Sequence, residues 1–440
     1  MRQSLLALLC CLPLLLAGQN AVLQSGPMVG YVDMREALIW VQTTRPAEVQ
    51  IKYREIGAGT DWMTSSIAKT EARLAHAVKL IADQVLPGKT YEYQVLVDGE
   101  EIDLPYPTQF QTQAIWRWRS DPPDFEVAMG SCVYVNEPQY DRPGNPYGGN
   151  YEIFESIDEA SPDLMLWLGD NNYLREVDWW TRTGIFHRYT HTRSLPEMQP
   201  LLAHTANYAI WDDHDFGPND SDRSWINKEI AKEAFDAFWG NPGSGLPGQD
   251  GGITTMFRYN DVDFFLLDNR YFRSPNDMHD RTDRVILGEQ QLDWLIEALV
   301  SSDATFKLVC IGGQVLNTAR RYEIYNNIAP NERYELLNRI ELEGIKNVVF
   351  LSGDRHHSEL SRLELSEDHV LYDFTASPLT SGSGSSRDEV NENRVPETLV
   401  LQRNFGFIEF SGPRDNRKMR LSIRDVSGEE LWSYEIEAQP

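Results

Sequence analysis

The chain has 440 residues, of which 41% are hydrophobic and 11% aromatic, and this composition excludes a wholly disordered protein and fits a globular protein of two or three domains. Its 67 acidic residues outnumber its 40 basic residues and give a formal net charge of −27. Because the phosphate backbone of a nucleic acid repels so negative a protein, we expect no stable nucleic-acid binding. Solubility is the simplest explanation of the acidity.

The first 20 residues predict a secretory signal peptide. A cation at Arg2 precedes an apolar run over residues 5–17, which is too short to span a bilayer, and small and polar residues follow it. A retained membrane anchor is the competing interpretation. Cys10 and Cys11 lie inside the run rather than just after it, which argues against a lipid-modified mature N-terminus. We therefore expect a secreted, periplasmic or cell-surface protein without a transmembrane segment in the mature chain.

Residues 21–117 predict a small all-β domain. The region consists of short alternating or β-branched runs, and turn sequences such as LPGKT and VDGE separate them. Strands spaced in this way are typical of an immunoglobulin-like or fibronectin-like sandwich. The segment at 118–124 has the composition of a linker.

Residues 124–440 predict a second domain, in which strands alternate with helices. Apolar strands run into polar loops, and residues 224–240 and 288–302 have the spacing of amphipathic helices. The first of these helices is expected to end at Gly240, because glycine commonly caps a helix C-terminus. This alternation indicates a layered α/β domain, and from about residue 362 the chain returns to short strands.

Polar motifs follow four of the expected strands. In open α/β sheets, functional sites form beyond the carboxyl ends of the strands, so these motifs are expected to meet. Each has an ordinary explanation when taken alone, since Asp and Asn favour turns and helix caps. Together they indicate a metal site, because a cation would neutralise the clustered carboxylates. The motifs are Gly130-Ser131-Cys132, Gly169-Asp170-Asn171-Asn172-Tyr173, Asp212-Asp213-His214-Asp215 and Gly353-Asp354-Arg355-His356-His357.

The order GSC, GDNNY, WDDHD and GDRHH resembles that of the calcineurin-like metallophosphoesterases, and specifically the alkaline phosphatase D (PhoD-type) family. In this branch, Gly-Ser-Cys replaces the common D-x-H motif, and the last motif reads G-D-x-H. The resemblance extends to the N-terminal β-domain and so covers nearly the whole mature chain. It implies a metallophosphoesterase fold, in which helices flank two packed sheets. The motifs are specific to the family and much less specific to a substrate.

The resemblance also implies a first metal position. Asp170 would bridge two metals, and Cys132 as a thiolate, Tyr173 as a phenolate and His356 would complete the first of them. Thiolate and phenolate ligands suit ferric iron, and the family implies Fe3+ there. Each residue also has a structural interpretation, since a cysteine or tyrosine after a strand is most often a packing residue.

A second metal position is implied at Asp213 and Asp354. Because oxygen-only ligation suits a hard cation, this metal would be Ca2+, or else Mg2+ or Mn2+. Asp212 is an alternative to Asp213 as the ligand. Many family members carry an Asn pair after this motif, and here Asn219 is the only close candidate. Asp215 is expected to orient its neighbours.

The expected catalytic residues are His214 and Arg175. His214 would not bind a metal but would stabilise the transition state and protonate the leaving oxygen, while a hydroxide that bridges the metals attacks phosphorus. Arg175 could hold a phosphate oxygen, although a salt bridge is an equally good interpretation. The other histidines at 187, 191, 204 and 357 are expected to pack or lie at the surface, and Cys310 is expected in the core.

The function that follows is a secreted alkaline phosphomonoesterase that acts on a small phosphate ester. A phosphodiesterase acting on phospholipid or cell-wall diesters would use the same two-metal site. A calcium-binding surface protein without catalysis is the alternative from another class. The complete set of presumed ligands, together with His214, argues against that alternative.

Overall fold

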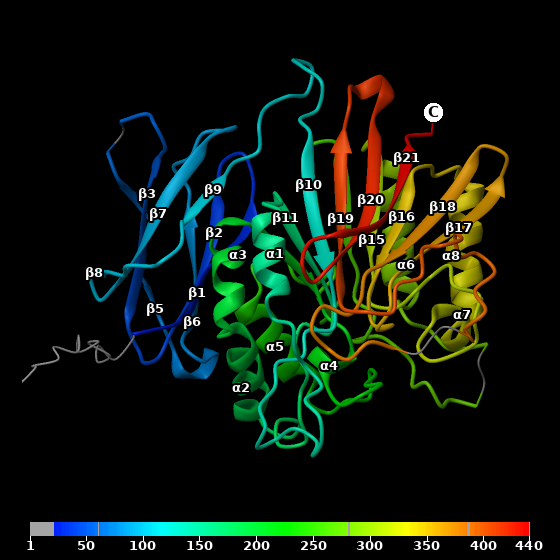
Figure 1. The fold of residues 1–440 in the computed structure, drawn as a ribbon, viewed down its shortest axis with the longest axis horizontal. Coiled ribbons are helices and arrows are strands. Elements are labelled where there is room, and N and C mark those ends of the chain that lie inside the picture. The colour runs from blue at the N-terminus through cyan, green and yellow to red at the C-terminus, as the bar shows by residue number, and fades with distance from the viewer. Residues whose placement is uncertain (1–21, 60, 280–281, 385–387, 440) are drawn as a thin grey trace, which may run out of the picture.

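The computed structural model describes residues 22–59, 61–279, 282–384 and 388–439. The predicted signal peptide lies outside these ranges. Figure 1 shows two parts side by side, a β-domain formed by the start of the chain and a larger layered domain that holds the α-helices. Within the described ranges, no helix is both long enough and apolar enough to cross a membrane.

The N-terminal domain is a sandwich of two sheets. Along β7, every second side chain is buried, as expected for a strand with one face in a core. The central strand of the first sheet, β2, is buried throughout, because its other side meets the larger domain, where Trp40 Nε1 donates to the carbonyl of Ala237 at 2.7 Å. The first sheet contains β1 (Leu23–Val32), β2 (Ala37–Thr43) and β6 (Ala77–Ala82), and the second contains β3 (Glu48–Glu55), β4 (Met63–Thr64), β5 (Ala68–Lys69), β7 (Thr90–Val97), β8 (Glu100–Glu101) and β9 (Gln109–Gln111).

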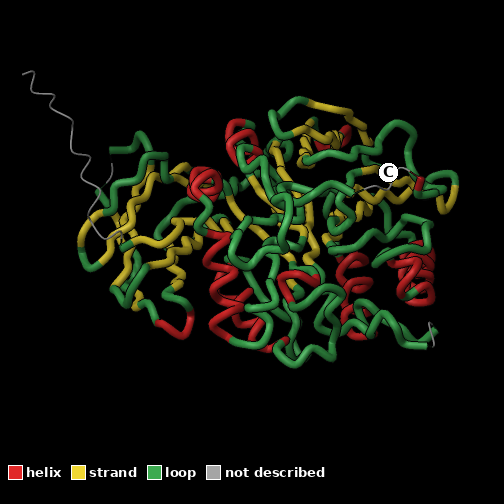
Figure 2. Tube along the Cα trace, turned by 60° about the horizontal axis from the view of Figure 1, so that its bottom comes forward, coloured by secondary structure: helices red, strands yellow, loops and turns green. Residues whose placement is uncertain are grey.

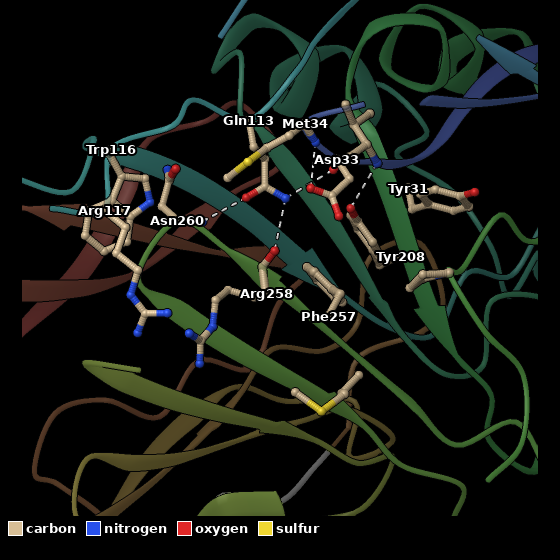
Figure 3. Close-up of a pocket in the computed structure, with 13 residues that line it drawn as sticks. Tyr31, Asp33, Met34, Gln113, Trp116, Arg117, Tyr208, Phe257, Arg258 and Asn260 are labelled. Atoms are coloured by element: carbon tan, nitrogen blue, oxygen red, sulfur yellow. Dashed lines mark hydrogen bonds between the residues drawn. The ribbon is translucent and has the colours of Figure 1, made fainter. Parts of the chain in front are cut away.

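Gln113, two residues after β9, forms hydrogen bonds to both domains. Its side-chain nitrogen donates to the carbonyls of Arg258 at 3.0 Å and Val32 at 3.3 Å, and its oxygen accepts from the backbone of Asn260 at 3.1 Å. Figure 3 shows these bonds in the wall of an interdomain cavity of about 330 Å³, which Trp116 also lines. The amide therefore fixes the position where the chain leaves the sandwich.

Gly240 has a different role from the expected helix cap. The helix α5 (Lys228–Phe238) ends two residues earlier. A Cβ atom on Gly240 would lie 2.8 Å from Cα of Gly30, and the Gly240 carbonyl accepts from the backbone of Tyr31 at 2.8 Å. Glycine is required here because two backbones touch across the domain contact.

The larger domain contains two six-stranded sheets with the orders β12-β11-β10-β19-β20-β21 and β13-β14-β15-β16-β18-β17. Strands β10, β11 and β12 are parallel to one another, as are β14, β15, β16 and β18. In register, Ala128 pairs with Met165, and Leu166 with Tyr208. The strands are β10 (Phe125–Gly130), β11 (Leu164–Leu168), β12 (Ala206–Ile210), β13 (Thr255–Tyr259), β14 (Val262–Leu266), β15 (Phe306–Cys310), β16 (Val348–Ser352), β17 (Glu359–Ser366), β18 (His369–Thr375), β19 (Asn404–Ser411), β20 (Lys418–Asp425) and β21 (Glu430–Glu437).

The two sheets pack face to face, with helices on their outer sides. Val349 and Leu351 of β16 point into the core between the sheets, whereas Val348 and Phe350 point into the core beneath α6 and α8. This alternation explains why the whole strand is apolar. Cys310 lies in the core between the sheets, as expected. The remaining helices are α1 (Ile153–Glu159), α2 (Arg182–Arg193), α3 (Gln199–His204), α4 (Asp213–Phe216), α6 (Glu289–Ser301), α7 (Tyr325–Ile328) and α8 (Pro330–Leu342).

The predicted fold class, two packed sheets flanked by helices and preceded by an all-β domain, is confirmed by this arrangement. In Figure 1, β10 points toward the lower edge of the larger domain, where α4 lies. Figure 2 brings that edge forward and shows that many loops gather there. This is the edge at which the four polar motifs emerge.

Candidate metal centre

The ends of the two sheets approach each other at the loop edge. A Cβ atom on Gly353, after β16, would lie 2.5 Å from Cβ of Ser131, after β10. A Cβ on Gly169, after β11, would lie 2.7 Å from that of Asp212, after β12. The glycines in these motifs therefore allow four strand ends, drawn from both sheets, to converge.

Four of the six expected metal ligands have left-handed backbone conformations. The φ angles are 63° at Cys132, 51° at Asp170, 63° at Asp354 and 53° at His356. Positive φ is uncommon for residues other than glycine, and such strained residues cluster at functional sites. The sharp turns they make direct the side chains inward, directly after the strands end.

The first cluster contains Cys132, Asp170, Tyr173 and His356. The Sγ atom of Cys132 lies 3.7 Å from Oδ2 of Asp170, and the hydroxyl of Tyr173 donates to the same oxygen at 3.1 Å. That hydroxyl is also 3.3 Å from Nε2 of His356. One sulfur, two oxygens and one nitrogen thus meet at one point, as expected for the first metal.

The environment of this cluster favours an ionised cysteine. Burial raises the pKa of Cys132, but the charge of His356 and hydrogen bonds from Ser131 and Ser377 outweigh it and lower the pKa below its usual value. Burial lowers the pKa of His356, and the thiolate together with the Gly382 carbonyl more than reverses this and raises it to about 9. Nδ1 of His356 lies 2.6 Å from that carbonyl, which leaves Nε2 to face the cluster.

The second cluster contains Asp212, Asp213 and Asp354, whose carboxylate oxygens lie within 4.8 Å of one another. Oδ1 of Asp213 and Oδ2 of Asp212 are buried without a hydrogen-bond partner among the described residues. Burial and neighbouring carboxylates raise the pKa of Asp170 and of Asp354 well above the usual value. Unpaired buried carboxylate oxygens at this density fit a site for hard cations.

The two adjacent aspartates differ in their surroundings. Asp213 lines the open cavity, and its Oδ2 accepts from the backbone of Asp220 at 2.7 Å. Asp212 lies beneath it, where Oδ1 accepts from Asn269 at 2.7 Å and from Nε of Arg270. The geometry therefore favours Asp213 as the ligand and Asp212 as the counter-ion of an arginine.

Arg270 extends this ion pair to a further carboxylate, Glu323, which lines the same cavity. Its guanidinium also binds both carboxylate oxygens of Glu323, which Arg273 contacts as well. All four side chains are buried. The sequence analysis missed this network, because its members come from three distant segments of the chain.

Asp215 closes the turn that presents these residues. It accepts hydrogen bonds from the backbones of Asn171 at 3.2 Å and Asp212 at 3.0 Å, and from the side chain of Asn172 at 2.9 Å. Asp212 and Asp215 form a capping box at the start of α4. The sequence left helix capping and metal binding as alternatives for this motif. In the structure, Asp212 and Asp215 cap the helix, while Asp213 between them faces the cavity as a candidate ligand.

His214 lies between the two clusters. Its ring packs on that of Tyr173 with centroids 4.1 Å apart, and its backbone donates to Oδ1 of Asp170 at 3.2 Å. A ring nitrogen lies within 4.8 Å of carboxylate oxygens of Asp170 and Asp213. Burial lowers the pKa of His214, so the imidazole is neutral near pH 7.

Both clusters open on a cavity of about 860 Å³. The residues that line it include Asp170, Asp213, His214, Asp354 and His356, together with Asn219. The sequence analysis missed several others. Arg355 was visible within the GDRHH motif, whereas nothing in the local sequence marks most of the others, which include Tyr147, Asp220, Asn276, Asp277, Arg284, Arg321, Tyr322, Glu323 and Glu389.

Arg175 does not line this cavity, contrary to its expected phosphate-binding role. Its Nε donates to Asp141 at 2.9 Å, its Nη2 donates to the carbonyl of Val135 at 2.8 Å, and its guanidinium stacks on Tyr134 at 3.8 Å. Through these contacts the guanidinium holds the loop after β10 in place. We therefore interpret Arg175 as a structural residue.

The histidines that the sequence analysis set aside are also outside the cavity lining. His187 and His204 pair with carboxylates near the surface. His357 is fully buried, with Nε2 3.8 Å from Glu359. Unlike His356, it does not line the cavity.

The fold, two packed sheets flanked by helices, is that of the metallophosphoesterases. Residues 128–415, more than half of the chain, match the family described as PhoD-like phosphatase. The chain therefore belongs to this family, as the resemblance predicted. Residues 20–115 match a family described as a domain of unknown function, DUF7800.

Known proteins support this assignment. The chain is 24% identical over 378 residues to alkaline phosphatase D of Bacillus subtilis, which covers 73% of this chain and 61% of that relative. A solved structure of PhoD superposes with a TM-score of 0.79 at 17% identity, covering 96% of this chain and 92% of that one. Purple acid phosphatase PPD1 from yellow lupin gives a TM-score of 0.65 at 12% identity, covering 93% of this chain and 74% of that one.

Proposed function

We propose that this protein is a metal-dependent phosphoric ester hydrolase, and specifically an alkaline phosphomonoesterase exported by its N-terminal signal peptide. The observation that carries the proposal is that two clusters lie at one cavity: one joins a thiol, a phenol, a carboxylate and an imidazole, and the other consists of carboxylates, two of which have an unpaired oxygen. Membership of the PhoD-like phosphatase family supports the same chemistry. The proposal includes three parts of the chain: a signal peptide at residues 1–20, a β-sandwich domain at 21–117 and a catalytic domain at 124–440.

The donor set fits two different cations. Cys132, Asp170, Tyr173 and His356 would hold Fe3+, since thiolate and phenolate suit a ferric ion. Asp170, Asp213 and Asp354 would hold Ca2+, or else Mg2+ or Mn2+, because these ions prefer oxygen ligands. A pair of cations supplies Lewis-acid chemistry, polarising a phosphoryl oxygen and activating water at ambient pH.

His214 acts on the leaving group in this proposal. Its ring packs on that of Tyr173, and one ring nitrogen lies within 4.8 Å of carboxylate oxygens of Asp170 and Asp213, the residues proposed to hold the metals. The lowered pKa keeps the imidazole neutral at alkaline pH. The neutral ring therefore donates an N–H hydrogen bond to the departing ester oxygen and stabilises the negative charge that develops there. This role does not require the imidazole to be protonated at the pH of the reaction.

Hydrolysis of a chromogenic phosphomonoester, compared with the matched diester in buffer containing iron and calcium, tests this function. The expected result is faster turnover of the monoester, lost on chelation and in Asp213→Ala. Faster turnover of the diester would replace the proposal with a phosphodiesterase. Metal binding without turnover of either ester would indicate a non-catalytic calcium-binding protein.

A further inference from the structure

Three arginines line the cavity without a role in the hydrolysis proposed above. They are Arg284, Arg321 and Arg355, and they come from three separate loops. Arg355 follows directly after the expected ligand Asp354, so it brings a positive charge to the same cavity as the metal centre. Arg284 and Arg355 are only 6% and 5% exposed.

Both buried arginines have donors without partners. Nη2 of Arg355 donates to Glu389 at 2.6 Å, but its Nε and Nη1 have no hydrogen-bond partner among the described residues. Arg284 donates through Nη2 to the Met278 carbonyl, and its Nε is likewise unpaired there. Buried, unpaired guanidinium donors carry a free-energy penalty, and a small rotation of either side chain toward an anion in the cavity would remove it.

Tyr322 adds an aromatic face to this part of the cavity. Its side chain is 70% exposed although it is large and apolar, and its backbone has a φ of 47°. The guanidinium of Arg355 lies 5.0 Å from its ring. With Glu389 on one edge and Tyr322 on one face, Arg355 is held in place, and its Nε and Nη1 keep no partner among the described residues.

The cavity also has more room than the scissile phosphate needs. Its volume of about 860 Å³ lies within the range of pockets that enclose whole small molecules. The rest of the substrate must therefore occupy the part of the cavity that the metal ligands do not line.

We propose that Arg284, Arg321 and Arg355 form an anion subsite that selects phosphate esters carrying a second anionic group on the leaving group. That group is a phosphate or a carboxylate, since both accept the paired N–H donors of a guanidinium. The proposal rests on the proposed function for the identity of the scissile ester, but the subsite can be measured by binding alone.

Binding of hydrolysis-resistant phosphonates to the metal-loaded protein, measured by calorimetry, tests the subsite directly. The probes are propylphosphonate, propane-1,3-bisphosphonate and its longer homologues up to six carbons, and the matching ω-carboxyalkylphosphonates. At the best chain length, a second anionic group should tighten binding roughly ten- to hundredfold, as expected for charge-assisted hydrogen bonds. The carboxylate and bisphosphonate arms identify which anion the subsite prefers.

Two variants and one control make the test specific. Arg321→Met and the double variant Arg355→Gln with Glu389→Gln should reduce this preference at least several-fold, and the double variant avoids leaving Glu389 buried and unpaired. Arg320→Met is the matched control, because Arg320 is an exposed neighbour outside the cavity lining. The control should keep the full preference.

Equal binding of mono- and bisphosphonates by the unaltered protein would overturn the subsite, as would a preference that survives in both variants. Turnover of propyl phosphate is measured in parallel and tests the hydrolase function alone. An arginine-dependent preference in a protein that hydrolyses no ester would support the subsite and refute the proposed function.

Discussion

Arg270→Met is the sharpest test of how the second metal position is held together. The guanidinium is fully buried and binds Asp212 on one side and both oxygens of Glu323 on the other. Methionine keeps much of the side-chain volume but leaves both carboxylates without this counter-charge. Breaking a buried ion pair by removing one partner costs about 3–5 kcal/mol in the free energy of unfolding.

The loss should also weaken metal binding. Burial raises the pKa of Asp212 to about 6 even though Arg270 opposes this. Without the arginine, the pKa of Asp212 rises further. Asp212 then becomes protonated more easily and loses the ion pair that fixes its position beside Asp213. Residues that orient metal ligands typically contribute about 10- to 100-fold to metal affinity, and we expect a loss of that size at the second position only.

Two measurements check this prediction. Denaturant unfolding, followed by the fluorescence of the 12 tryptophans, gives the change in stability. Metal analysis after dialysis against graded calcium and iron gives the two affinities. Adding Asp212→Asn to Arg270→Met removes the carboxylate that has lost its cationic partner and should recover part of the stability. If Arg270→Met changes stability by less than about 0.5 kcal/mol and leaves both affinities unchanged, the network does not support the site.

Four further predictions address the ligands and the pH dependence. Tyr173→Phe should abolish a visible ferric–phenolate absorption band, and an iron-free, colourless but fully active protein would refute the ligand assignment. His214→Ala should lower kcat by about 10²- to 10⁴-fold at unchanged metal content; loss of metal instead would identify His214 as a ligand. The pKa of Glu359 is about 2, because His357 and Arg394 outweigh the effect of burial. Since a depressed carboxyl pKa stabilises the fold above the usual value near 4.5, that contribution, about 3 kcal/mol, should disappear as the pH falls toward 2, and Glu359→Gln should show a correspondingly flatter acid limb of stability against pH. Burial raises the pKa of Asp212 to about 6 and of Asp215 to about 8, so these carboxyls should make the metal-free protein lose stability as the pH rises from about 4 to 8, and a chelated protein as stable at pH 8 as at pH 5 would contradict this.

The elements easiest to predict were those whose pattern reflects one local environment. The alternation of β7 and the apolar runs of β14, β15 and β16 indicated a half-buried sandwich and a doubly covered sheet. The helix α8 was missed, because charged residues interrupt its apolar positions throughout its length. Gly240 was assigned to the wrong function, because a close contact between two domains leaves no trace in the sequence around it.

The ligand motifs were visible because each lies directly after a strand, and parallel strands of a sheet end at a common edge. Residues near one another in the sequence therefore carried enough information to locate the metal centre and its family. The sequence also predicted that the clustered carboxylates need cations, since that follows from their charge alone.

Tertiary structure decided how neighbouring residues divide their tasks. Asp212 and Asp213 are indistinguishable in the sequence, and only the approach of Arg270, 58 residues away from Asp212, separates the buried counter-ion from the residue that faces the cavity. Arg175 follows one ligand motif and Arg355 lies within another. The first donates to the loop after β10, whereas the second lines the cavity. Strand order brings side chains to a common edge, but the direction of each one depends on long-range packing partners that the local sequence does not contain.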